Sequence, residues 1–468
     1  MSAWAPCAVD AWYPALRAPV DALHVLGEDV PPRPAAVARA WARTAPGEAL
    51  VVLHRRRGPA RLLGLGRRSP ARRLAALLPG AGRADRWFVF PGTGGSHVLL
   101  PACRQGFAAG LRLLPAGRLR WRAARRLLEG LGRRGLAERL GLDELLVAVK
   151  GPAGSPRAAW IAGLDRPALT VALGVPGRFR KAAVLASGAG GRVHGLVKLS
   201  LSGAAGEQVR REAGTLEDLA ALAPGEALAP ALLGRGEAGG ASWLAEEFLD
   251  GRRSPDVLGA AHVEFLASLQ GRTAAAVELG ELELFRAAAA RLDAPGAALD
   301  PAWYGAMVRL RDALRERLAG ERVPCCRSHG DFTPWNLLVR GGRLAAFDWE
   351  FSEPRAPALF DLLHFHVQTG VLVRHVDAPR LLRELDVLAA GAARTLFAPA
   401  GPPPVSMAAL AGLYVLHVAT LDDEVHRIER PPFVQVEWLR SARRELAELL
   451  ADRLRAEAGG ADAEVRAA

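Results

Sequence analysis

Hydrophobic positions in the middle of the chain change from short runs to a helical repeat. Short apolar runs at 168–173, 182–186 and 193–199 are separated by glycine-containing turns, which predicts the strands of a small sheet. From residue 255 onwards, apolar residues recur every three or four positions, which predicts amphipathic helices. His262 falls on the first of these helical stripes, and we expect it to be packed in the core. The pattern therefore predicts an α+β protein.

This pattern predicts an ion pair between a lysine and a glutamate. Lys198 lies in the third predicted strand, and the next segment, 207–219, has the spacing of a helix. Glu212 falls on the apolar stripe of that helix, which should face the sheet. Because an unpaired buried charge is costly, we expect Glu212 to bind Lys198. The pair either directs an ammonium at nucleotide phosphates or is a purely structural salt bridge.

Two turns between the predicted strands contain several glycines, at 174–181 and at 187–191. Neither has a complete G-x-G-x-x-G pattern, so each is also compatible with an ordinary hairpin. The first turn joins the first two strands of the small sheet, where a loop covering nucleotide phosphates belongs. We therefore favour Gly174 and Gly177 for that role.

The stretch 329–336 reads His-Gly-Asp-Phe-Thr-Pro-Trp-Asn and is the strongest candidate for a catalytic loop. It places Asp331, which can accept a hydroxyl proton, five residues before Asn336, which can bind a metal ion. The next residues predict a hairpin with Gly341-Gly342 as its two-residue turn. In that hairpin Asn336 faces Phe347, and Asp348 lies one step beyond.

Asn336 and Asp348 would thus bring two side-chain oxygens close together, since opposed residues on paired strands lie roughly 4.5–5.5 Å apart. Oxygen ligands of this kind suit Mg²⁺. The alternative is that His329, Asp331 and Asn336 only form a polar turn, but the coincidence with the hairpin and Asp348 favours a metal site. Asp361 precedes an apolar helix and either caps it or hydrogen-bonds to the loop.

The composition limits the class of protein. The chain has 468 residues, of which 50% are hydrophobic, enough for two or three domains. No apolar run approaches the ~18–20 residues that span a bilayer, and the first residues do not form a secretion signal. The four cysteines match neither metal-ligand spacing nor a disulfide framework. We therefore expect a cytoplasmic protein without a membrane span.

The net charge of +12 raises the question of a polyanionic partner. Basic residues recur along the whole chain, without a nucleic-acid motif or a basic stripe interleaved with aromatics, which argues against nucleic acid. Lysines are rare, so a strand lysine such as Lys198 indicates a place where a compact ammonium is required. The acidic cluster 422–424 is either an exposed face or an approach site for a cationic substrate.

Composition also suggests the domain boundaries. Residues 1–150 form an Arg-rich N-terminal extension, with Arg runs at 55–57, 67–68 and 133–134, and residues 151–167 read as a Gly- and Pro-containing linker. The Arg runs are either a solvated face or a partner site. A small lobe is expected at 168–250, a large helical lobe at 251–455 and a flexible tail at 456–468.

Taken in order, these features resemble the aminoglycoside phosphotransferase and choline kinase group of the protein-kinase-like fold, over residues 168 to 450. The resemblance implies a bilobal α+β fold, with a small antiparallel-sheet lobe and a mainly helical lobe, preceded by a separate N-terminal α/β region. It also implies ATP or GTP as phosphoryl donor. The site residues it implies are Lys198 on the phosphates, Glu212 holding Lys198, Asp331 as base, Asn336 and Asp348 as Mg²⁺ ligands, and His329 and Asp361 as braces of the loop.

The protein-kinase signatures V-A-I-K and A-P-E are absent from the sequence, which favours a small-molecule acceptor. The predicted function is transfer of the γ-phosphate of ATP or GTP to a hydroxyl of a small polar molecule such as an aminoglycoside, a sugar or a choline-like metabolite. The alternative is a nucleotide-binding pseudokinase that docks a partner.

Overall fold

The structure is a computed structural model. It describes residues 9–16, 21–26, 33–54, 70–91, 96–114, 119–140, 142–152, 158–165, 167–222, 228–294, 300–396, 405–429 and 434–467. The chain forms two compact units, the first made of Met1–Glu217 with Pro230–Phe248 and the second of Asp218–Ala229 with Leu249–Ala468. The secondary structure is α+β, as the sequence predicts.

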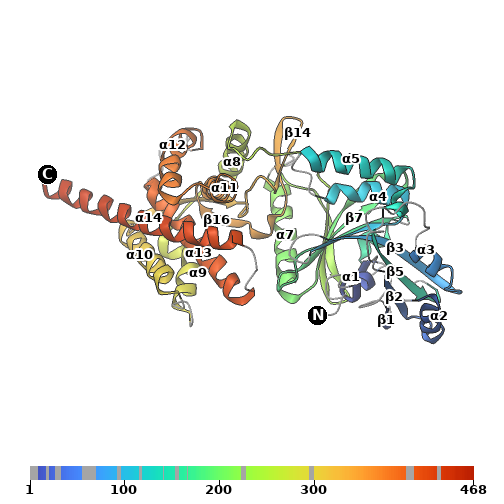
Figure 1. The fold of residues 1–468 in the computed structure, drawn as a ribbon. Coiled ribbons are helices and arrows are strands. Elements are labelled where there is room, and N and C mark those ends of the chain that lie inside the picture. Colours follow the sequence, from blue (N-terminus) through green and yellow to red (C-terminus); the bar gives the residue numbers. More distant parts are fainter. Residues whose placement is uncertain are drawn as a thin grey trace. The chain divides into compact units, whose positions relative to one another are not determined.

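Among the described residues of the first unit, ten strands form one sheet in the order β1-β2-β5-β3-β4-β6-β7-β8-β10-β9 (Figure 1). Their bounds are β1 Leu23–Leu26, β2 Ala49–His54, β3 Ala81–Pro91, β4 His97–Pro101, β5 Asp143–Lys150, β6 Ala168–Leu173, β7 Lys181–Ser187, β8 Val193–Ser200, β9 Leu232–Ala238 and β10 Ala241–Glu246. β1 and β2 are parallel, and the other neighbours are antiparallel. The three strands predicted from 168 to 199 are thus confirmed.

The pairing of β4 with β6, from His97 opposite Leu173 to Leu99 opposite Val171, crosses the expected linker. Strands from residues 1–150, expected as a separate region, therefore lie in the same sheet as the strands after residue 168. Pairing satisfies the backbone groups that an open edge of either half would expose. Residues 153–157 and 166 of the expected linker, and the Arg runs at 55–57 and 67–68, lie outside the described residues.

Helices cover both faces of this sheet because successive strand side chains point to opposite sides. On one face α1 (Val9–Leu16) shares a core with Val51 of β2 and Trp87 of β3. On the other face α2 (Pro34–Arg43) and α3 (Pro70–Ala75) pack against Leu50 and Val52. The remaining helices of this unit are α4 (Arg104–Gly110), α5 (Leu119–Arg133) and α6 (Ala159–Ala162), and α7 (Gly203–Leu222) begins in it.

The second unit is mainly helical. Its helices are α8 (Ala260–Thr273), α9 (Glu283–Asp293), α10 (Pro301–Arg317), α11 (Phe360–Leu372), α12 (Ala378–Leu396), α13 (Met407–Glu429) and α14 (Val434–Ala467). Among its described residues, two three-stranded sheets have the orders β11-β14-β15 and β12-β13-β16. Their strands are β11 (Arg252–Arg253), β12 (Ala275–Glu278), β13 (Arg322–Ser328), β14 (Leu337–Arg340), β15 (Arg343–Ala346) and β16 (Glu353–Pro357).

The helical stripes predicted from the sequence face the core of this unit. His262 is buried on α8, where its Nε2 lies 2.7 Å from Ser254 Oγ and its Nδ1 accepts the Gly259 N–H at 3.1 Å. It is therefore a packed core histidine, as predicted. The last helix differs from the expectation of a tail after 455, because α14 continues to Ala467. None of the helices in the described part of the chain is both long and apolar enough to cross a membrane.

Candidate active site

The stretch 329–336 connects β13 to β14, and its path requires a glycine. Gly330 has a φ of +88°, a left-handed value that residues with a Cβ rarely adopt. A Cβ at this position would lie 2.1 Å from the carbonyl oxygen of Phe351. The loop and the segment around Phe351 can approach this closely only because residue 330 has no side chain.

The carboxylate of Asp361 holds the first residues of this loop. Its Oδ2 accepts the backbone N–H of His329 at 2.6 Å, and its Oδ1 accepts that of Gly330 at 3.0 Å. Asp361 is buried, and burial raises its pKa, although these two hydrogen bonds act in the opposite direction. Of the two possibilities left open by the sequence, the hydrogen bonds to the loop are the ones observed.

His329 fastens the loop to the hairpin that follows. Its Nε2 lies 2.9 Å from the carbonyl oxygen of Phe347, and a carbonyl can only accept, so Nε2 carries the hydrogen. Its Nδ1 accepts the backbone N–H of Asp331 at 3.2 Å. These partners assign His329 as a neutral ring in one tautomer. The ring also packs on Trp349, with the two ring centroids 4.5 Å apart.

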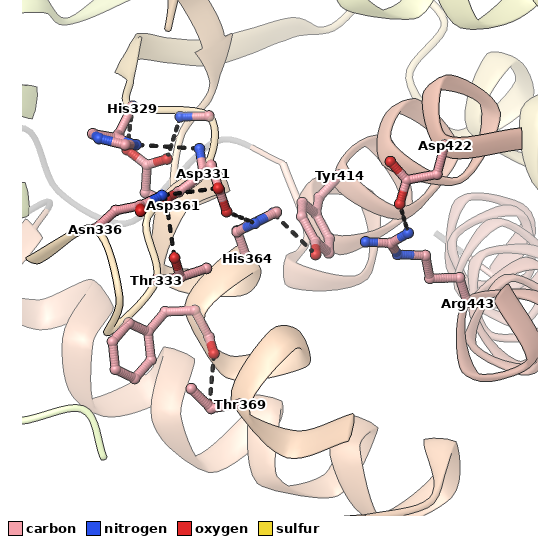
Figure 2. Close-up of polar contacts among 12 residues, drawn as sticks. His329, Asp331, Thr333, Asn336, Asp361, His364, Thr369, Tyr414, Asp422 and Arg443 are labelled. Carbon is pink, nitrogen blue, oxygen red and sulfur yellow. Dashed lines mark hydrogen bonds and ion pairs between the residues drawn. The ribbon is translucent and has the colours of Figure 1, made fainter. Parts of the chain in front are cut away.

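Both carboxylate oxygens of Asp331 have side-chain donors. Oδ2 accepts Nδ2 of Asn336 at 2.8 Å, and Oδ1 lies 3.1 Å from Nε2 of His364 (Figure 2). Burial acts to raise the pKa of Asp331, whereas the hydrogen bond and electrostatic effect of His364, the electrostatic effect of His329 and the hydrogen bond from Asn336 act to lower it, and the pKa lies below its ordinary value. The side chain is still 32% exposed. Asp331 is therefore an ionised, accessible carboxylate in a fixed orientation.

The hairpin after the loop has the predicted register, from Leu337 opposite Ala346 to Arg340 opposite Arg343. Gly341 and Gly342 both have positive φ angles, 54° and 82°, as a two-residue type I′ turn requires. At the open end, the N–H of Phe347 donates to the carbonyl of Asn336 at 3.0 Å. The predicted hairpin is thus confirmed. Phe347, the residue before Asp348, pairs with Asn336 at its open end.

Asp348 has a left-handed backbone, with φ 64° and ψ 62°. This conformation costs a residue with a Cβ about 1–2 kcal/mol, and such strain is concentrated at functional sites. Asn336 directs its amide nitrogen to Asp331 through two hydrogen bonds, so its carbonyl oxygen is the atom suited to a cation. A carboxylate and an amide oxygen are hard ligands, and this donor set fits Mg²⁺. Among the described residues, no group of three or more His, Cys, Asp or Glu side chains could hold a metal ion.

The first unit contains the predicted lysine pair. Lys198 Nζ lies 2.5 Å from Glu212 Oε1, and both side chains are buried. Leu244 of β10 is opposite Lys198 in the sheet and packs against α7, which carries Glu212. A second carboxylate was not predicted: Glu246 Oε1 lies 3.3 Å from the same ammonium. The sequence could have indicated this contact, because Glu246 lies two residues after Leu244 and therefore on the same face of β10, the face that packs against α7.

The two glycine turns connect β6 to β7 and β7 to β8. In the first, the N–H of Gly174 donates to Lys181 O at 3.0 Å, and that of Arg180 donates to Gly177 O at 3.3 Å. In the second, Gly190 and Gly191 have positive φ angles. Each turn is thus a hydrogen-bonded hairpin connection, and the phosphate-covering role of Gly174 and Gly177 stays a prediction.

Comparison with known proteins bears on this arrangement. Residues 182–393 match the model of the phosphotransferase enzyme family. The predicted family resemblance is confirmed. The matched residues include Lys198, Glu212, the loop with Asp331, the hairpin and Asp361, whereas Gly174 and Gly177 precede them.

The chain is also similar to solved structures of phosphotransferases. Aminoglycoside-3'-phosphotransferase of type VIII is 19% identical, with 50% of this chain and 87% of that chain covered and a TM-score of 0.33. The GDP complex of aminoglycoside 2'-phosphotransferase-IIIa is 16% identical, with 59% and 91% covered and a TM-score of 0.34. Glucosamine kinase in complex with glucosamine, ADP and inorganic phosphate is 17% identical, with 61% and 94% covered and a TM-score of 0.32. No curated protein matches the chain.

Each carboxylate of the acidic cluster 422–424 forms an ion pair with an arginine. Asp422 pairs with Arg443, Asp423 with Arg440, and Glu424 with Arg291 at 2.8 Å. These ion pairs join neighbouring helices. Of the two readings of the cluster, the arrangement does not favour an approach site for a cationic substrate, because each carboxylate already has a cation.

His364, Tyr414 and Arg443 are the polar residues behind Asp331 that sequence reasoning missed (Figure 2). His364 had a local signal, because it lies three residues after Asp361 and so on the same side of α11. Tyr414 and Arg443 come from α13 and α14, and no spacing within the sequence connects them to the loop.

Proposed function

We propose that the protein transfers the γ-phosphate of ATP or GTP to a hydroxyl of a small polar molecule, such as an aminoglycoside, a sugar or a choline-like metabolite. The observation that carries this proposal is Asp331: an ionised and partly exposed carboxylate, oriented by Asn336 and His364, on a loop held by Asp361. The family match over residues 182–393 supports the same reaction class.

In this proposal Asp331 is the general base. Its lowered pKa keeps it ionised at neutral pH, and it accepts the proton of an acceptor hydroxyl that comes within about 2.6–3.2 Å. Phosphoryl transfer depends mainly on positioning and on neutralisation of charge. The contacts of His329 and Asp361 with the loop backbone supply that positioning, since they fix the residues on either side of Gly330.

Asn336 and Asp348 would hold Mg²⁺. When bound, the ion neutralises charge on the phosphates of the nucleotide. Asn336 would then have two tasks, because its amide nitrogen orients Asp331 while its carbonyl oxygen would bind the cation. A substitution at Asn336 should therefore affect both the base and the metal requirement.

Lys198 is assigned to the nucleotide phosphates, with Glu212 and Glu246 holding its ammonium in place. Gly174 and Gly177 are proposed to lie in the loop that covers those phosphates. We propose a cytoplasmic location. Reduced thiols fit that compartment, and Cys325 and Cys326 are free and buried, with burial raising both pKa values.

The test is phosphate transfer from radiolabelled ATP or GTP, with MgCl₂, to a panel of aminoglycosides, sugars, inositols and choline. Asp331→Asn keeps the shape of the side chain and removes the base, so turnover of any accepted compound should fall by orders of magnitude. Asp312→Asn, at a 52% exposed site, is the matched control and should keep full activity. Equal turnover of Asp331→Asn and the wild type would exclude the mechanism, and nucleotide binding without turnover of any compound would favour the pseudokinase alternative.

A further inference from the structure

A chain of buried polar contacts leads away from the back of Asp331 (Figure 2). His364 of α11 contacts Asp331 through Nε2 at 3.1 Å and lies 3.5 Å from the hydroxyl of Tyr414 through Nδ1. Arg443 of α14, which pairs with Asp422, lies close enough to Tyr414 of α13 for its charge to act on the phenol. His364 thus connects Asp331 to Tyr414 on α13.

With a neutral His364 ring, the donors in this chain have one consistent direction. A carboxylate only accepts, so Nε2 of His364 carries the hydrogen that faces Asp331. In a neutral ring Nδ1 is then an acceptor, and the hydroxyl of Tyr414 donates to it. Arg443 can only donate, and it donates to the carboxylate of Asp422. The donors of Tyr414 and His364 therefore both point along the chain toward Asp331.

Burial makes this direction stable. His364, Tyr414 and Arg443 are all buried, and burial raises the pKa of Tyr414, so the phenol keeps its hydrogen. In a low-dielectric interior each hydrogen bond of such a chain strengthens the next. His364 and His329 act electrostatically on Asp331 and Asp361, and Arg443 of α14, Asp422 of α13 and Asp331 act on Tyr414.

We propose that His364 is a positioning residue for Asp331 and that Tyr414 holds it in the Nε2–H tautomer. This inference rests on the proposed function, because it assigns His364 a role in orienting the base. Asn336 holds one carboxylate oxygen and His364 the other, so the carboxylate cannot rotate. If His364 adopted the opposite tautomer, a lone pair would face Asp331 and the orientation would be lost.

Kinetics of His364 variants test the positioning role. His364→Leu removes the donor, and we expect kcat to fall about 10–100-fold, the size of effect that a misplacement of about 1 Å causes, with the nucleotide KM within about twofold of wild type. His364→Gln restores a donor amide and should recover most of kcat. His366→Gln is the matched control, because His366 lies on the same buried helix but contacts the carbonyl of Leu381. Equal effects of the Leu and Gln variants at 364 would overturn the positioning role.

The tautomer step has its own test, a double-mutant cycle. Tyr414→Phe removes the hydroxyl that selects the tautomer, so kcat should fall several-fold in the presence of His364. In the His364→Gln background the same substitution should have no effect on kcat, since an amide has no tautomers. Additive effects of the two substitutions would refute the assignment to Tyr414. Thermal unfolding of each variant shows whether a loss of activity is a loss of fold.

A measurement without substrate separates this inference from the proposed function. In protein labelled with ¹⁵N-histidine, the two ring nitrogens of His364, assigned by their loss in His364→Gln, report which one is protonated. We expect a protonated Nε2 in the wild type and a mixture of tautomers in Tyr414→Phe. A protonated Nδ1 in the wild type would overturn the inference even if phosphoryl transfer is found, and the expected pattern would support it before any acceptor is known.

Discussion

Gly330→Ala is the most informative single change in the loop. The new Cβ would lie 2.1 Å from Phe351 O and 2.6 Å from Phe351 C, both backbone atoms. Because such contacts are normally at least 3.0 Å, the loop or the opposing segment must move by roughly 1 Å. The left-handed backbone adds a second penalty, since φ is +88°.

The two penalties can be separated in magnitude. A Cβ in a left-handed conformation costs about 1–2 kcal/mol, and overpacking typically costs a further 1–3 kcal/mol. We expect Gly330→Ala to lower the free energy of unfolding by about 2–5 kcal/mol in total. A displacement of about 1 Å at Asp331 should also reduce turnover about 100-fold.

Gly320→Ala provides the matched control. Gly320 lies in the same unit with a φ of +75°, and its added Cβ would meet nothing within 4 Å. Gly320→Ala should lower the free energy of unfolding only by the cost of the left-handed backbone, about 1–2 kcal/mol, and should keep full activity. Urea unfolding of the two variants and the wild type, with phosphotransfer assays on the folded proteins, gives both quantities. Equal losses in stability at 330 and 320, together with full turnover in Gly330→Ala, would refute the close-approach argument.

Other predictions address the remaining parts of the molecule. Glu212→Ala breaks a buried ion pair and should cost about 3 kcal/mol in urea unfolding, the lower end of the range because Glu246 remains, whereas Glu217→Ala, at a 47% exposed site, should cost under about 1 kcal/mol. Asp348→Asn should raise the Mg²⁺ concentration needed for half-maximal turnover at least 10-fold, because even the loss of a residue that only hydrogen-bonds to a metal ligand lowers metal affinity about 10–100-fold. An unchanged Mg²⁺ titration would exclude Asp348 as a ligand. Burial lowers the pKa of His262, so its contribution to stability is present above about pH 6.5 and is lost as the pH falls through the folded pKa; His262→Gln should remove this share of the pH dependence between pH 7 and 5 in unfolding experiments.

Several parts of the site could be predicted because they depend on local rules. The Gly341-Gly342 turn determines the hairpin register, and with it the pairing of Asn336 with Phe347, the residue before Asp348. The helical repeat placed Glu212 on the buried face of α7, and burial of a carboxylate required a cation, which is Lys198. Both predictions use residues less than twenty positions apart.

Other features depended on packing between distant segments. The tertiary structure brings Glu246 to Lys198, joins β4 to β6 in one sheet and continues α14 past the expected tail. It also pairs Asp422 with Arg443, so that a cation within the unit already binds a carboxylate for which the sequence allowed either an exposed face or an approach site for a cationic substrate.

The contact of His364 with Asp331 shows where the division lies. The sequence by itself determined that Asp331 sits in a loop before a hairpin, because spacing and turn residues act over a few positions. Only the tertiary structure decided what stands behind the carboxylate, since α11, α13 and α14 supply His364, Tyr414 and Arg443 from positions 33 to 112 residues further along the chain. Hydrogen bonds between residues of different helices produce no periodic pattern in the sequence of any single helix.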